Sequence, residues 1–243
     1  MERLFVGSPF LRRNFFDHLI NGIEKDYPKI LNNYKKKIIE RNNILKKINY
    51  DINWIKQVET EIVNYGLKIY EMRKNYIKIL NSEIKLLPII NKNTHSFKLM
   101  IVDDFLGDHD IYEEDFKLKY LLKIQDTREH DGIIGGCKIG PHKSDIHGTY
   151  LSNNLNLALC STGQQKAIVL LIIIAQSKYL INELNRQPIV LLDEICSHLD
   201  ESNREILLEL IHSLDVQTFL TGTEKSFFSF LSKKANYYSI NDN

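Results

Sequence analysis

The fold of this chain is decided by the stretch "PIVLLDEICSHLD", Pro188–Asp200. Its apolar run, 189–192, predicts a short buried strand, and Asp193 and Glu194 follow that strand directly. Ligands of open α/β sheets bind beyond the carboxyl ends of the strands, so we expect both carboxylates to face a site. The alternative is an ordinary strand whose acidic end caps the next helix.

The segments around this strand predict a parallel sheet. From Ser161 onward the residue pattern predicts a helix, the strand 189–192, a helix over about 201–213, a strand over 218–220, and then a further helix and strand. Such alternation is typical of parallel strands covered by helices. We therefore expect an α/β domain built on a parallel sheet, which we call the head.

The part of the chain before residue 95 has a helical texture and few Gly or Pro residues. Apolar residues recur there at alternating steps of three and four, which predicts a helix that packs along a partner helix: Ile55, Val58, Ile62, Tyr65, Ile69, Met72, Tyr76 and Ile79. A similar pattern over 27–48, broken by Arg41, offers that partner. We expect a short antiparallel helical arm over residues 1–95 and the head over 96–243, with a half-buried strand at "SFKLMIVDD", a helix over about 111–127 and a hairpin near 152–154.

Composition excludes several classes of protein. Hydrophobic residues make up 43% of the chain and charged residues 26%, as in globular domains. The longest apolar run, 167–175, has about half the length of a membrane span, so we interpret it as a buried helix. Three widely separated cysteines and the lack of a charged-then-apolar leader suit a reducing cytoplasm. We expect a cytoplasmic protein without membrane contact.

A second candidate element is "CSTGQQKA", Cys160–Ala167, at the start of that apolar helix. Ser161 suits the position that caps a helix, and Gly163 allows backbone N–H groups to approach a ligand closely. Free N–H groups and the helix dipole make a helix N-terminus suitable for binding an anion. The alternative is a plain helix cap.

Taken together, these motifs resemble the C-terminal half of an ABC-type ATPase. A Ser-x-Gly-Gln-Gln helix start, a strand ending in Asp-Glu about 25 residues later, and "SHLD" occur in the order of that superfamily. The chain further resembles the RecF family over essentially its whole length. That resemblance rests on "GSPFLRRNFFD", "YKKKIIERNNILK", "GPHKSDI", "STGQQKA" and "TFLTGT".

The resemblance implies a set of roles for individual residues. Ser161, Gly163 and Gln165 would contact the γ-phosphate of ATP held by the opposite subunit of a dimer. Asp193 would hold Mg²⁺ and Glu194 would orient or deprotonate the attacking water. Asp200 would couple the two sites of the dimer, and Thr221 or Thr223 would sense the γ-phosphate.

The resemblance also implies cofactors and partners. They are ATP and Mg²⁺, single-stranded or gapped duplex DNA, a second copy of the chain in the ATP state, and RecO and RecR, with which the family helps to load recombinase.

One motif of the family is missing. The 243 residues contain no G-x-x-x-x-G-K-[ST] phosphate loop, which in RecF lies in an N-terminal part of roughly a hundred residues. We therefore expect a RecF-like chain that lacks this part and turns over negligible ATP alone, because much of the γ-phosphate charge would be left uncompensated. The alternatives are a non-enzymatic module that binds DNA or a partner through the arm, and half of another split ABC-type ATPase.

The remaining candidates lie in the arm and in the Gly-rich segment after it. Basic residues dominate 28–47, and Lys35, Lys36, Lys37 and Arg41 are candidates for binding DNA phosphates, with a solvated helix face as the alternative. Cys137, His142 and His147 have a spacing that suggests zinc, but no fourth ligand is evident, so we expect none. We interpret Trp54 and most of the arm's tyrosines as core residues.

Overall fold

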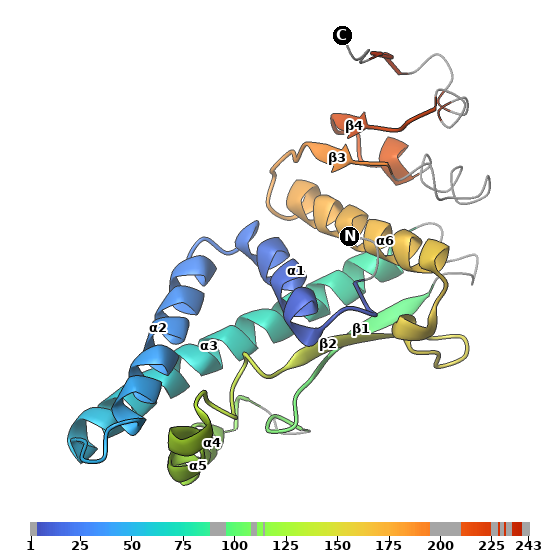
Figure 1. Ribbon diagram of the computed structural model, residues 1–243. Helices are drawn as coiled ribbons and strands as arrows, with labels where there is room; N and C mark the ends of the chain where they lie inside the picture. Colours follow the sequence, from blue (N-terminus) through green and yellow to red (C-terminus); the bar gives the residue numbers. More distant parts are fainter. Residues whose placement is uncertain are drawn as a thin grey trace. The chain divides into compact units, whose positions relative to one another are not determined.

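The computed structural model describes residues 4–87, 96–107, 111–113, 115–194, 210–224, 228, 231 and 235–239 (Figure 1). Within these ranges the helices and strands follow one another in the order α1 (Pro9–Asn21), α2 (Tyr27–Leu45), α3 (Ile52–Lys85), β1 (Phe97–Val102), α4 (Phe116–Asp126), α5 (Arg128–Ile134), β2 (Asp145–Tyr150), the short 3₁₀ helix η2 (Leu157–Leu159), α6 (Thr162–Asn182), β3 (Val190–Leu192) and β4 (Thr218–Leu220). The part of the chain that is described is therefore an α/β protein rich in helices.

The chain forms two compact units. The arm unit comprises Phe5–Asn81 and Lys98–Thr149, and the head unit comprises Met1–Leu4, Ser82–Phe97 and Tyr150–Asn243. Residues 98–149 thus pack with the helices of the arm, whereas we predicted a domain boundary at residues 95 and 96. Our boundary followed the change in residue pattern along the chain, which does not report on packing between distant segments.

Helices α2 and α3 form the predicted antiparallel hairpin of the arm unit (Figure 1). Three contacts along it run in opposite chain directions: Asn33 with Tyr65, Lys37 with Glu61, and Arg41 with Glu59. The predicted apolar seam of α3 is confirmed, since Ile55, Val58, Ile62, Ile69 and Tyr76 are buried. The partner seam on α2 is shorter than predicted, because Ile48 lies beyond the helix and is almost wholly exposed.

Arg41, which interrupts the apolar pattern of α2, is fully buried. Its guanidinium donates to the Glu59 carboxylate at 3.0 Å, the Asp131 carboxylate at 2.7 Å and the Ile124 carbonyl at 2.8 Å. A buried charge needs this degree of pairing, because the desolvation of an unpaired ion costs several kcal/mol, roughly. Arg41 therefore joins α2, α3 and the α4–α5 segment.

A second buried arginine, Arg73, joins α3 to α1 and to the loop before β2. It donates to both oxygens of Asp17, at 2.9 and 2.8 Å, and to the Pro141 carbonyl at 2.5 Å. Tyr27 donates to the same Asp17 carboxylate at 2.6 Å. Burial disfavours the charge of Arg73, yet Tyr27 and Asp17 raise its pKa above the usual range. The Arg73 guanidinium therefore stays charged inside the arm unit.

Strands β1 and β2 form a two-stranded sheet at the margin of the arm unit. Buried and exposed side chains alternate along β1, as predicted for a half-buried strand. The Asn81 side chain pairs with the backbone of Leu99, donating to its carbonyl and accepting from its N–H, both at 2.8 Å. The helix predicted over 111–127 is α4, which begins at Phe116. At the hairpin predicted near 152–154, the Leu155 carbonyl accepts a backbone hydrogen bond from Tyr150 across the turn at 151–153.

In the head unit, α6 is the predicted buried helix, with Ile168, Leu170, Ile172 and Ile174 nearly inaccessible. Strands β3 and β4 pair in parallel, with Val190 opposite Thr218 and Leu192 opposite Leu220, which confirms both predicted strands and their direction. Most of the helix predicted between them lies outside the described residues, which resume at Leu210. Among the described helices, none has the length and apolar character needed to span a membrane.

Candidate nucleotide site

The carboxyl ends of β3 and β4 bring three of the predicted site residues together. The Thr221 hydroxyl donates to Asp193 Oδ1 at 2.5 Å and accepts from the backbone N–H of Glu194 at 3.1 Å. A backbone bond from Thr221 N to the Leu192 carbonyl, 3.1 Å, keeps the two strand ends in register. Parallel pairing therefore places side chains that are 28 residues apart in the sequence side by side.

Both acidic residues of this group are exposed to solvent. Glu194 has a φ of 49°, a left-handed conformation that is uncommon for a residue other than glycine. Such conformations persist where the surrounding structure holds them, and they are frequent at functional sites. The Thr221 hydroxyl supplies that support here, since it accepts from the Glu194 backbone.

The start of α6 has the cap that the sequence predicted. Ser161 Oγ accepts from the Gln164 N–H at 3.3 Å, and Gln164 Oε1 accepts from the Ser161 N–H at 3.0 Å, so the two form a capping box. Ser161 is exposed and Gly163 is half-buried, so both are open to a ligand. Gln165 is buried, and its Nε2 donates to the Cys160 carbonyl at 3.0 Å. In this conformation the Gln165 amide faces the interior, and its Oε1 has no hydrogen-bond partner.

The donor set at the strand ends suits Mg²⁺ held together with a phosphate. Asp193 shares one carboxylate oxygen with Thr221, which leaves the other for a ligand. Mg²⁺ binds through one or two carboxylates together with phosphate oxygens and water. Within the described ranges, no group of three His, Cys, Asp or Glu side chains forms a metal cage. The residues therefore fit a nucleotide-bound Mg²⁺ rather than an ion held by protein alone.

Two other predicted site residues, Asp200 and Thr223, are not part of the group at the strand ends that the structure describes. Asp200 lies outside the described residues. Thr223 is described and exposed, but the contacts to Asp193 and Glu194 are made by Thr221. Of the two threonines considered, Thr221 is therefore the one that belongs to the group at the strand ends.

The segment 137–147, whose Cys and His spacing suggests zinc, is held by hydrogen bonds. His142 lies between the Tyr34 hydroxyl and the Cys137 carbonyl, each at 2.7 Å, while His147 pairs with Asp145 at 2.9 Å. Burial lowers the pKa of His142 to about 4 and raises the pKa of the Cys137 thiol. Among the described residues, these three side chains do not form a cluster that could hold a metal ion.

The four basic candidates for DNA on α2 are not equivalent. Arg41 is buried and paired, so its guanidinium is not available to a phosphate, which corrects the expectation for this residue. Lys37 bridges Glu40 at 3.0 Å and Glu61 at 2.8 Å. Lys35 and Lys36 are exposed. The structure therefore leaves these two for contact with a partner, and Trp54, which we predicted to be buried, is 44% exposed near them.

Sequence reasoning missed the role of the "RRNFFD" and "GPHKSDI" motifs, which are tied to each other. Arg12 of the first motif donates to both carboxylate oxygens of Asp145 of the second, at 2.7 and 2.6 Å. Arg13 donates to the Ser144 carbonyl at 2.6 Å, and Asp17 reaches the second motif through Arg73. Gly140 has a φ of 125°, and a Cβ there would lie 2.3 Å from the Tyr34 hydroxyl. Basic and acidic residues in two separate motifs were the available signal.

Comparison with known proteins agrees with the resemblance that the motifs indicate. No family model matches the chain. The DNA replication and repair protein RecF of Agrobacterium fabrum is 30% identical over 246 residues, which include 99% of this chain and 64% of that protein. RecF of Rhizobium etli is 28% identical over 242 residues, again with 64% of its length covered. The chain thus spans slightly less than two thirds of the curated relatives it matches.

Two solved structures share the fold. One is a structure of the recombination mediator protein RecF with ATP in the RecFOR pathway, with a TM-score of 0.75 and 26% identity over 90% of this chain and 59% of that one. The RecF-ATPrS structure has a TM-score of 0.74 over the same shares. The α/β fold is therefore that of RecF. Over its whole length, this chain is homologous to the C-terminal part of RecF, the DNA replication and repair protein.

Proposed function

We propose that the chain contributes the C-terminal part of a RecF-like ATPase that acts in DNA replication and recombinational repair. The observation that carries this proposal is the juxtaposition of Asp193, Glu194 and Thr221 at the carboxyl ends of two parallel strands. Ligand sites of α/β sheets lie at such edges. The names of the relatives, which are DNA replication and repair proteins, support the same role.

In this proposal each residue has a defined task. Asp193 holds Mg²⁺ on the nucleotide, and that ion neutralises charge on the phosphates when it is bound. Glu194 orients the attacking water and accepts its proton. Thr221 positions both by its two hydrogen bonds, and its hydroxyl would sense the γ-phosphate.

The start of α6 would act on the nucleotide of a second copy. Ser161 and Gly163 present a helix N-terminus, which attracts a phosphate through its N–H groups and dipole. Gln165 would take part only after its side chain leaves the Cys160 carbonyl. Asp200 would couple the two sites. The homodimer therefore forms in the ATP state and opens after hydrolysis.

The substrate in this proposal is single-stranded or gapped duplex DNA, and the partners are mediators of the RecO and RecR type. The solved RecF structures are described as belonging to the RecFOR pathway, which supports that choice. We place this work in the cytoplasm. ATP turnover also needs a phosphate loop, which these 243 residues do not contain.

The test is DNA-stimulated ATP hydrolysis by the purified chain, alone and mixed with the N-terminal part of a RecF protein. We expect turnover only in the mixture, and its loss in Glu194→Gln, which keeps the shape of the side chain but removes the base. Glu183→Gln, an exposed change at the far end of α6, is the matched control. Turnover that survives Glu194→Gln would contradict the assigned base.

A soluble, folded chain that stays inactive in the mixture would favour the alternative of a binding module. Equilibrium dialysis of the mixture with ATP and Mg²⁺ measures nucleotide binding. It therefore separates a loss of binding from a loss of chemistry. In Glu194→Gln, nucleotide binding without turnover would support both roles, because Asp193 would still hold the ion while the base is missing.

A further inference from the structure

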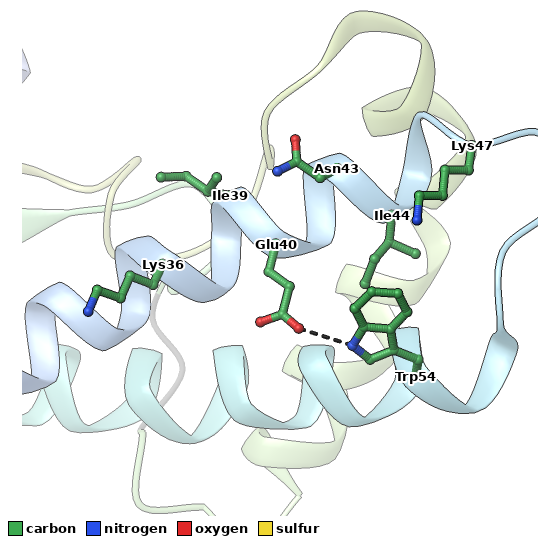
Figure 2. Close-up of a pocket in the computed structure, with 7 residues that line it drawn as sticks. All are labelled: Lys36, Ile39, Glu40, Asn43, Ile44, Lys47 and Trp54. Carbon is green, nitrogen blue, oxygen red and sulfur yellow. Dashed lines mark hydrogen bonds between the residues drawn. The ribbon is translucent and has the colours of Figure 1, made fainter.

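A shallow groove lies at the closed end of the α2–α3 hairpin, within the arm unit (Figure 2). Its volume is about 320 Å³. We call it the arm-tip groove, and its lining includes Lys36, Ile39, Glu40, Ile44, Lys47 and Trp54. All six come from the last turns of α2, the turn after it and the first turn of α3.

The tryptophan in the arm-tip groove is held in place before any ligand arrives. Trp54 Nε1 donates to Glu40 Oε1 at 3.0 Å, as the dashed line in Figure 2 marks. Lys37 neutralises the same carboxylate at 3.0 Å, and Lys47 Nζ lies 5.5 Å from the indole centre. A side chain that is already ordered loses little entropy on binding, which suits a contact residue.

The surroundings of the groove combine exposed apolar side chains with a basic margin. Ile39, which lines the groove with Trp54, is 59% exposed, and Ile48 and Ile52, at the turn between α2 and α3, are 99% and 49% exposed. Exposed apolar groups gathered in one place mark sites of association. Lys35, Lys36, Lys46 and Lys47 surround them, and none of these four forms a salt bridge with a described carboxylate.

We propose that the arm-tip groove binds an acidic amphipathic segment of a partner protein. One apolar side chain of that segment packs against Ile39 and Trp54, and its carboxylates face Lys36 and Lys47. Trp residues in partly enclosed pockets dominate binding energies at protein interfaces, and charged margins select complementary partners.

Two other occupants, single-stranded DNA and a second copy of the chain, fit the arm-tip groove less well. Single-stranded DNA is held by stacking successive bases on several aromatic side chains, and the residues that line the arm-tip groove include one aromatic side chain, Trp54. The isoleucines offer nothing to phosphates. A second copy of the chain would bring two lysine-rich margins together, and like charges oppose such contact.

The experiment uses Trp54, which is the only tryptophan of the chain, so its fluorescence reports on this groove alone. The probe is a synthetic peptide of about 14 residues, about four helical turns, with Leu and Phe on one face and Glu on the other. Matched probes are the same peptide with Lys in place of Glu, and a thymidine oligonucleotide of about 20 nucleotides.

We expect a saturable blue shift of Trp54 emission with the acidic peptide only. The double variant Lys36→Glu and Lys47→Glu should weaken its binding by about tenfold or more. Ile39→Ser should weaken it without changing its dependence on salt. Lys78→Glu, the same charge change at an exposed position on α3 outside the groove, should leave binding unchanged. A labelled peptide measured by anisotropy provides a readout independent of the indole.

Three results would overturn the proposal. They are a response to the oligonucleotide with none to the acidic peptide, a response to no probe, and a change in emission with protein concentration alone. The first identifies a nucleic-acid site, and the third identifies self-association. The groove variants lie outside the head unit, so ATP turnover of the mixture described above tests the proposed function separately.

Discussion

The arm unit buries several of its charged residues in ion pairs, whereas the head unit leaves those of its candidate site in water. Arg41 and Arg73 are almost inaccessible and donate to carboxylates and carbonyls of other segments. Asp193 and Glu194 are exposed at the ends of short strands. Buried ion pairs specify how segments join, because breaking one leaves an uncompensated charge. Exposed carboxylates contribute little to stability and remain available for chemistry.

The largest effect is expected from Arg73→Met. It leaves the Asp17 carboxylate buried without its partner, so we expect the free energy of unfolding to fall by about 3–5 kcal/mol. Urea denaturation of the full chain measures the loss. The double variant Arg73→Met and Asp17→Leu should recover much of it, since no charge is left unpaired. Equal losses in the single and the double variant would show that packing, not charge, matters here.

A smaller effect is expected on the pH dependence of stability. Burial lowers the pKa of His142 to about 4, below its ordinary value of 6.5. As the pH falls, the unfolded chain therefore binds a proton at this histidine before the folded chain does. The contribution of the neutral His142 to stability is complete above pH 6.5 and is lost between pH 6.5 and 4. The loss is on the order of 2–3 kcal/mol. Denaturation at several pH values should show a shallower slope for His142→Gln.

His147→Gln is the matched control for that measurement, because the His147 side chain is 39% exposed and that of His142 is largely buried. Its pH dependence should follow that of the unchanged chain. If both variants have the same slope as the unchanged chain, the titrating group lies elsewhere.

The capping box at the start of α6 should contribute about 1 kcal/mol. Ser161→Ala removes the acceptor for the Gln164 N–H, and Ser161→Asp replaces it with another good cap. We expect the first variant to be less stable and the second to be close to the unchanged chain, measured by denaturation and by hydrogen exchange at Gln164. Equal exchange in both variants would mean that the cap is not formed in solution.

The smallest effect, and one of opposite sign, is expected at Glu194. Asparagine tolerates the left-handed conformation better than glutamate, so Glu194→Asn should raise the free energy of unfolding, by up to about 1 kcal/mol. ATP turnover of the mixture should be lost at the same time. A destabilised variant would contradict the idea that backbone strain is concentrated at this position. It would also mean that the exposed Glu194 contributes to stability, as the buried charges of the arm unit do.

Much of the local structure was predictable from the sequence. The seam of α3, the buried helix α6, its cap at Ser161 and the parallel strands β3 and β4 all follow from periodicity and from residue preferences. These are local properties, set by 3.6-residue and two-residue repeats and by side chains that bond to nearby backbone. The motifs quoted from the sequence also predicted the similarity to RecF, which extends over 99% of the chain.

Tertiary structure decided which charged residues serve packing and which stay available. Arg41 and Lys36 both belong to one basic run in the sequence, but only Arg41 meets Glu59 and Asp131, which come from 18 and 90 residues away. Thr221 becomes part of the site only because parallel pairing aligns two strand ends. Trp54 remains 44% exposed although its indole donates to Glu40 of α2, a contact that only the hairpin creates. Burial and pairing depend on segments far apart in the chain, and no local pattern encodes them.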